Sequence, residues 1–232
     1  MKPFRTSRLI LLSILLLLEG CGQVKEQVRQ ELGTPAAAPA PSDARFVQVL
    51  TLDDSKSVGD FSSMGHQAEA AIRGSGCDTL VGYTFANIVE NLPLPVSPKD
   101  DSKAAESIEE GYVLKQPAQV AGTTLVPVLK KVEELLTTYP QAKLFVCIGT
   151  DAHLEDTGIK GGYELLEKQF DTLKKVAKER VVFFFFGVRP DTDQAFVARA
   201  IKAAGSFSGQ VFVASQTDFA SKLLAAKQML FR

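Results

Sequence analysis

VVFFFFGV, at residues 181–188, contains four consecutive phenylalanines and no polar side chain. Successive residues of a strand point to opposite faces, so a strand of this composition is apolar on both faces. Such strands are typical of parallel sheets that are covered by helices on both sides. The stretch therefore predicts a buried central strand of an α/β domain.

Strand-like and helix-like segments alternate on both sides of this run. The strand-like segments are 46–52, 79–85, 112–114, 143–148 and 210–214. Apolar residues at helical spacing predict helices over 66–72, 125–136, 163–176, 196–204 and 219–230. This alternation predicts one domain over residues 45–232, with a Rossmann-like, doubly wound, mostly parallel sheet and helices on both faces. Sites in such sheets form at the carboxyl ends of the strands, which directs attention to polar residues there.

Composition limits the class of partner. The chain has 232 residues, 45% of them hydrophobic, which is enough for one sizeable α/β domain with appendages. Its 26 basic and 27 acidic residues give a formal net charge of −1. Because no large basic field is available to hold phosphates, we expect no nucleic-acid partner.

The N-terminus has the features of an export signal. Three basic residues precede an apolar run over 9–18, which is too short to cross a bilayer as a helix. Leu18-Glu19-Gly20-Cys21 follows and resembles the lipobox of bacterial lipoproteins, although Glu19 replaces the usual small or apolar residue. The resemblance implies a signal peptide over 1–20, a lipid on Cys21, and a lipid-anchored protein in the bacterial cell envelope, outside the cytoplasm.

The segment after the lipobox predicts a tether. Residues 21–44 contain a polar, charged stretch and then the sequence TPAAAPAP at 34–41. A segment of this composition buries little apolar surface and stays extended and flexible.

Two further cysteines belong to the predicted domain. Cys77 and Cys147 lie at or in apolar runs that we do not expect to be neighbouring strands. We therefore expect two buried thiols and no disulfide.

Polar residues gather at three of the predicted strand and helix ends. The first strand ends in Asp53-x-Ser55-x-Ser57, Gly122-Thr123 precedes a strong helix, and Asp151 follows a later strand. Mg²⁺ takes oxygen ligands in near-octahedral geometry and retains several of its waters. Neutral hydroxyls quench little of the ion's charge, so one coordination position would stay electrophilic.

These three parts, in this order, resemble the metal-ion-dependent adhesion site (MIDAS) of the von Willebrand factor A family, and the resemblance covers residues 45–230. It implies that Ser55 and Ser57 bind the metal directly, that Asp53 and Asp151 bind it through water, and that Thr123 changes role between states. The implied ion is Mg²⁺, or Mn²⁺ or Ca²⁺. The implied partner is a protein whose exposed acidic residue completes the coordination.

The sequence thus favours a membrane-anchored binding or scaffolding module that is not an enzyme. One alternative is a metal-dependent hydrolase or phosphotransferase, which would need a nucleophile or general base beside the metal. Asp54 and His153 are the only nearby candidates. The other alternative is a structural lipoprotein with a degenerate site, whose hydroxyls only cap loops and helices. We expect Asp53→Ala to leave the fold intact, because the motif lies at the exposed end of a strand.

Overall fold

A six-stranded sheet forms the centre of the domain. The computed structural model describes residues 43–95, 101–115, 122–151, 162–188, 204–207 and 209–232. The strand order is β3-β2-β1-β4-β5-β6, and every neighbouring pair is parallel except β2 and β3. The strands are β1 (Phe46–Asp53), β2 (Thr79–Phe85), β3 (Val89–Leu92), β4 (Lys143–Gly149), β5 (Val181–Phe186) and β6 (Val211–Val213). The expected mostly parallel sheet is confirmed.

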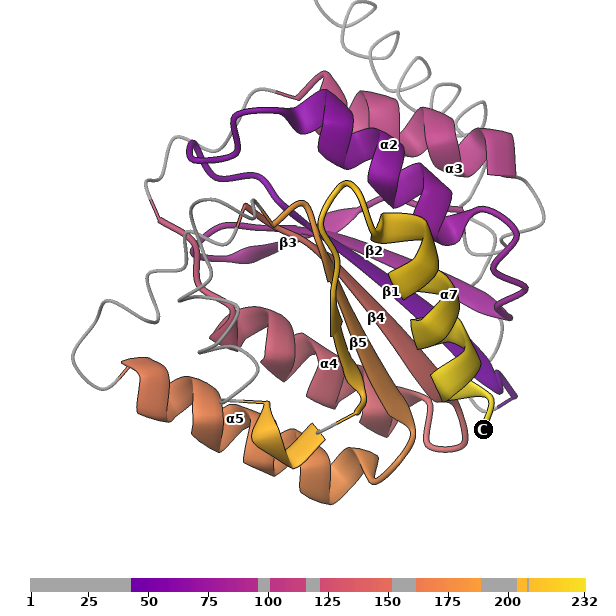
Figure 1. Cartoon of the computed structure of the whole chain (residues 1–232), viewed down its shortest axis with the longest axis vertical. Helices are drawn as coiled ribbons and strands as arrows, with labels where there is room; N and C mark the ends of the chain where they lie inside the picture. Colours follow the sequence, from indigo (N-terminus) through magenta and orange to yellow (C-terminus); the bar gives the residue numbers. More distant parts are fainter. Residues whose placement is uncertain (1–42, 96–100, 116–121, 152–161, 189–203, 208) are drawn as a thin grey trace, which may run out of the picture. The chain divides into compact units, whose positions relative to one another are not determined.

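Helices cover both faces of the sheet (Figure 1). One face carries α2 (Phe61–Ile72), α3 (Asp101–Ile108), the π-helical turn η1 (Glu109–Val113) and α7 (Phe219–Leu230). The opposite face carries α4 (Val126–Thr138), α5 (Gly162–Ala177) and the short 3-10 turn η3 (Gly205–Phe207). The domain is thus three layers thick, with one apolar core on each side of the sheet.

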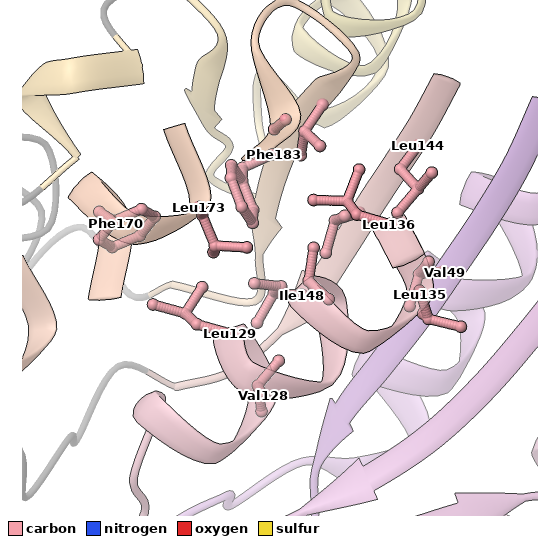
Figure 2. Packing of buried hydrophobic residues seen from close by; sticks show 14 of the residues in the cluster. Val49, Val128, Leu129, Leu135, Leu136, Leu144, Ile148, Phe170, Leu173 and Phe183 are labelled. Carbon is pink, nitrogen blue, oxygen red and sulfur yellow. The ribbon is translucent and has the colours of Figure 1, made fainter. Parts of the chain in front are cut away.

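The phenylalanine run supplies side chains to both cores, as its sequence predicts. Phe183 and Phe185 of β5 pack in the core under α4 and α5, whereas Phe184 and Phe186 pack in the core under α2 and α7. All four side chains are fully buried. Figure 2 shows Phe183 between residues of α4 and α5, including Leu129, Phe170 and Leu173.

One predicted strand is wrong. Residues 112–114 were expected to be a strand, but Tyr112 and Val113 belong to η1, and the missing strand is β3. The segment packs closely on α2 because Gly65 has no side chain there; a Cβ on Gly65 would lie 2.5 Å from Cγ2 of Val113. Only one of the four residues of β3 is buried, so it lacks the apolar alternation that marks a strand. It forms instead by antiparallel pairing with β2.

Other expectations fall outside the described residues or agree with them. The N-terminal features up to residue 42 and most of the helix expected at 196–204 lie outside the described residues. In the part of the chain that the structure describes, no helix has the length and apolarity needed to span a membrane. Cys77 and Cys147 are buried free thiols, as expected.

Candidate metal site at the carboxyl ends of β1 and β4

The topology brings the predicted site residues to one edge of the sheet. β1 and β4 are neighbours although β2 and β3 come between them in sequence, so the connections leave their carboxyl ends in opposite directions. Ligand sites of open α/β sheets form at such a switch point. Asp53 is the last residue of β1, Asp151 follows β4, and Thr123 lies in the segment that leads into α4.

Asp53 is the centre of this edge. Its Oδ1 accepts hydrogen bonds from the backbone N–H of Ser55 at 3.0 Å and from Oγ1 of Thr123 at 3.2 Å. Its Oδ2 accepts a hydrogen bond from Oγ1 of Thr150 at 2.8 Å. One carboxylate therefore joins the loop after β1, the segment before α4 and the end of β4.

The two serines of the first motif connect Asp53 to Asp151. Oγ of Ser55 and Oγ of Ser57 lie 2.9 Å apart, and Oγ of Ser57 donates to Oδ1 of Asp151 at 3.3 Å. Adjacent ligands in an octahedral magnesium shell, with metal–oxygen distances of roughly 2.0–2.1 Å, lie about 2.9 Å apart. The two serine hydroxyls thus have the spacing that neighbouring ligands of such a shell require.

The site is buried, contrary to the expectation that the motif lies at an exposed strand end. The side chains of Asp53, Ser55 and Thr123 have no exposed surface and Asp151 is 3% exposed, whereas Ser57 is exposed. Burial raises the pKa of Asp53 from 3.8 to about 6, although hydrogen bonds from Ser55 and Thr150 oppose the rise. A buried carboxylate with a raised pKa is stabilised by a nearby cation, so the site is electrostatically suited to a metal ion.

Two residues of this region were not among the predicted site residues. Thr150 is fully buried and donates to Asp53, but a single threonine at a strand end has no distinctive sequence signal. Tyr112 is also fully buried, and its hydroxyl donates to the backbone carbonyl oxygen of Asp53 at 2.6 Å. Its contact spans 59 residues of sequence, and the segment was expected to be a strand, so no local pattern could have indicated it.

Asp54 points to a different environment from Asp53. Its Oδ2 lies 3.5 Å from Nζ of Lys115, which also lies 3.2 Å from Oε2 of Glu90 on β3. Burial raises the pKa of Asp54, and the Lys115 ammonium acts in the opposite direction. Asp54 thus forms an ion pair with Lys115 at this edge.

The donor set decides which ion these residues could hold. Within the described residues there is no group of three or more His, Cys, Asp or Glu side chains that could hold a metal. A site here would combine two carboxylates with serine and threonine hydroxyls, all of them oxygens. Oxygen-only donors suit Mg²⁺, Mn²⁺ or Ca²⁺ better than metals that prefer imidazole or thiolate. His153, a candidate base in the hydrolase alternative, lies outside the described residues.

Comparisons with known proteins identify the fold. The chain matches manganese-loaded Plasmodium vivax TRAP protein with a TM-score of 0.58 and 16% identity, covering 80% of this chain and 73% of that one. It matches a von Willebrand factor type A structure from Catenulispora acidiphila with a TM-score of 0.56 and 15% identity, covering 81% of this chain and 42% of that one. It matches mussel byssus proximal thread matrix protein 1 with a zinc-occupied MIDAS motif, with a TM-score of 0.52 and 12% identity, covering 80% of this chain and 47% of that one.

These matches establish a von Willebrand factor A-like α/β fold for the chain. No protein-family model matches the sequence, and a search of curated proteins finds no match either.

Proposed function

We propose that this von Willebrand factor A-like domain is a binding module that holds one divalent cation at the carboxyl ends of β1 and β4. The observation that carries the proposal is the single network that joins Asp53, Ser55, Ser57, Thr123 and Asp151 through contacts of 2.9–3.3 Å. Two of the structurally similar proteins hold manganese or zinc, which supports a divalent ion here.

The same network supports a role in binding a partner. Its serine and threonine donors are neutral hydroxyls, which quench little of the charge of a divalent ion. An ion held in this way retains affinity for another anionic oxygen, and a carboxylate from a protein partner is the simplest one. Ser57 is the exposed member of the network, so a partner would approach from its side.

The environment of Asp54 favours a binding module over a hydrolase. A hydrolase at this edge would need a general base beside the metal. Asp54 is the adjacent acidic residue, but it is paired with Lys115. We therefore propose a non-enzymatic function. By the lipobox-like sequence that ends at Cys21, we further propose that the module is anchored by a lipid in the bacterial cell envelope.

Calorimetric titration of the purified chain in detergent tests the metal site. The wild-type chain should bind one Mg²⁺ or Mn²⁺, and Asp53→Asn should lose most of that binding. Asp54→Asn is the matched control, because it removes a neighbouring carboxylate that lies outside the network, and it should retain the site. Absence of binding to the wild-type chain would reject the site. Undiminished binding in both Asp53→Ala and Asp151→Ala would place the metal elsewhere.

The use of the metal is tested separately. A partner captured from solubilised envelope should be released by a chelator and should not be captured by Asp53→Asn. Capture that survives chelation would leave the metal site in place and remove its proposed role in binding.

A further inference from the structure

Tyr112 contacts both ends of the serine loop, which connects β1 to α2 and contains Ser55 and Ser57. Its hydroxyl oxygen lies 2.6 Å from the carbonyl oxygen of Asp53, the last residue of β1. The same oxygen lies 3.1 Å from Sδ of Met64, in the first turn of α2. One fully buried side chain therefore joins the residues on either side of the loop that carries two of the candidate metal ligands.

The position of Tyr112 is itself fixed by close packing. Its ring centroid lies 5.1 Å from that of Phe61, the first residue of α2. Tyr112 belongs to the π-helical turn η1, and such turns are frequent at functional sites. A Cβ on Gly65 of α2 would lie 2.5 Å from Cγ2 of Val113, and a Cβ on Gly111 would lie 2.7 Å from the side chain of the last residue of β3. Tyr112 therefore cannot shift without moving α2 or β3.

The hydrogen bonds within the serine loop give it its turn but leave its span undetermined. The backbone N–H of Ser55 donates to Oδ1 of Asp53 at 3.0 Å, and the backbone N–H of Val58 donates to the carbonyl oxygen of Ser55 at 3.2 Å. Both bonds are local to the first half of the loop. They do not set the distance between the end of β1 and the start of α2, across which the loop presents its two serine hydroxyls.

We infer that Tyr112 is a positioning residue of the metal site, whose hydroxyl holds the two ends of the serine loop at the spacing that metal binding requires. The inference rests on the proposed function. Tyr112 acts through the backbone of Asp53 and through α2, and not as a ligand. Groups that orient metal ligands in this way typically contribute about 10–100-fold to metal affinity. A near-octahedral oxygen shell tolerates little displacement of its ligands, so the effect should be large for the ions proposed here.

Titration of the full chain in detergent with Mn²⁺ tests the inference, because the EPR signal of free Mn²⁺ gives the affinity directly. Tyr112→Phe removes the hydroxyl and keeps the ring, so Mn²⁺ should bind about tenfold or more weakly than to the wild-type chain. Tyr112→4-aminophenylalanine keeps a hydrogen-bond donor at the same position and should restore most of the wild-type affinity. This rescue separates the donor from the volume of the ring.

Thr51→Val is the matched control. Thr51 is buried on β1, and its hydroxyl donates to the backbone carbonyl oxygen of Cys147 at 3.3 Å. The substitution therefore also removes a buried hydroxyl that donates to a carbonyl oxygen, but it leaves both contacts of Tyr112 in place. It should leave the affinity for Mn²⁺ unaltered, even where it lowers the temperature of unfolding.

The outcomes separate the inference from the function on which it rests. Wild-type affinity for Mn²⁺ in Tyr112→Phe would overturn the positioning role and leave the metal site standing. An equal loss of affinity in Thr51→Val would also overturn it, because any loosening of the core would then weaken binding. The same holds if Tyr112→4-aminophenylalanine binds as weakly as Tyr112→Phe. Absence of Mn²⁺ binding to the wild-type chain would overturn both the inference and the proposed function.

Discussion

At the scale of single residues, Asp53 combines two demands that oppose each other. Its carboxylate is buried, and burial disfavours the charged form, which is why its pKa rises to about 6. Three donors nevertheless point at it, from Ser55, Thr123 and Thr150. These bonds hold the side chain in one orientation, but they do not supply the positive charge that would balance it. The site is therefore least stable when it is charged and metal-free.

Asp53→Asn should stabilise the metal-free chain at pH 7.5. A carboxyl whose folded pKa is raised contributes most to stability below its unfolded pKa of 3.8, and that contribution is lost as pH rises through about 6. The rise in the pKa of Asp53 lowers the free energy of unfolding by about 3 kcal/mol at neutral pH. An amide avoids this cost, and the hydroxyl of Thr150 can accept from it instead of donating. In chelator, the variant should therefore be more stable than wild type at pH 7.5 and should lose that advantage at pH 4.

Chemical denaturation at the two pH values, with chelator and with Mg²⁺, measures this. Mg²⁺ should raise the free energy of unfolding of the wild-type chain and leave that of Asp53→Asn unchanged. If the variant is less stable than wild type in chelator at pH 7.5, the hydrogen bonds to Asp53 outweigh its burial.

Part of the site could be predicted from the sequence, because some of its residues belong to a motif. Asp53, Ser55 and Ser57 have a spacing that is recognisable within five residues, and the alternation of elements places Thr123 and Asp151 at the same edge. The burial of the site could not be predicted, because it depends on how two separate segments, η1 and the residues before α4, pack over the end of β1. Tyr112 illustrates the limit. Its partner is a backbone carbonyl, which every residue has, so no residue type in the sequence indicates the contact.

At the scale of elements, the apolar strands were predictable and the edge of the sheet was not. β5 is apolar at every position, as expected of a strand buried on both faces, and β2 and α7 have the bounds that their apolar patterns predict. β3 has only four residues, and its formation depends on the turn that precedes it and on pairing with β2. The chain between β3 and α4 forms α3 and η1, whose close contact with α2 depends on Gly65. Such contacts are tertiary and leave no periodic signal.

Phe184→Asp should destabilise the domain by several kcal/mol. Phe184 has no exposed surface, and its ring stacks on Phe145 at 6.1 Å and meets Phe219 at 5.5 Å. The substitution removes these contacts and buries a carboxyl among apolar side chains, where such a charge is costly. Thermal unfolding of the purified chain is the measurement, and Phe231→Asp is the control, because Phe231 is 59% exposed. A Phe184→Asp chain that unfolds at the wild-type temperature would show that β5 is not central.

At the scale of the whole molecule, the candidate site and the start of the described chain lie at opposite ends of one strand. The described chain begins at Asp43, and β1 starts at Phe46. Asp53 ends the same strand, and seven steps of a strand span about 23 Å. A tether that precedes residue 43 would therefore be connected to the end of β1 opposite the candidate metal site.

Cys21 should carry the anchor. Of the three cysteines, Cys77 and Cys147 are buried in the core beneath α2, and burial raises the pKa of Cys147 to about 12, so its thiol is neither accessible nor nucleophilic. Intact mass of chain extracted from bacterial membranes should show loss of residues 1–20 and a gain of acyl mass. Cys21→Ser should lose the acyl mass and the membrane retention, whereas Cys77→Ser should keep both. Cleavage at another bond, or an unmodified Cys21 in membrane-bound protein, would show that the lipobox resemblance does not reflect processing and that the domain is held by another means.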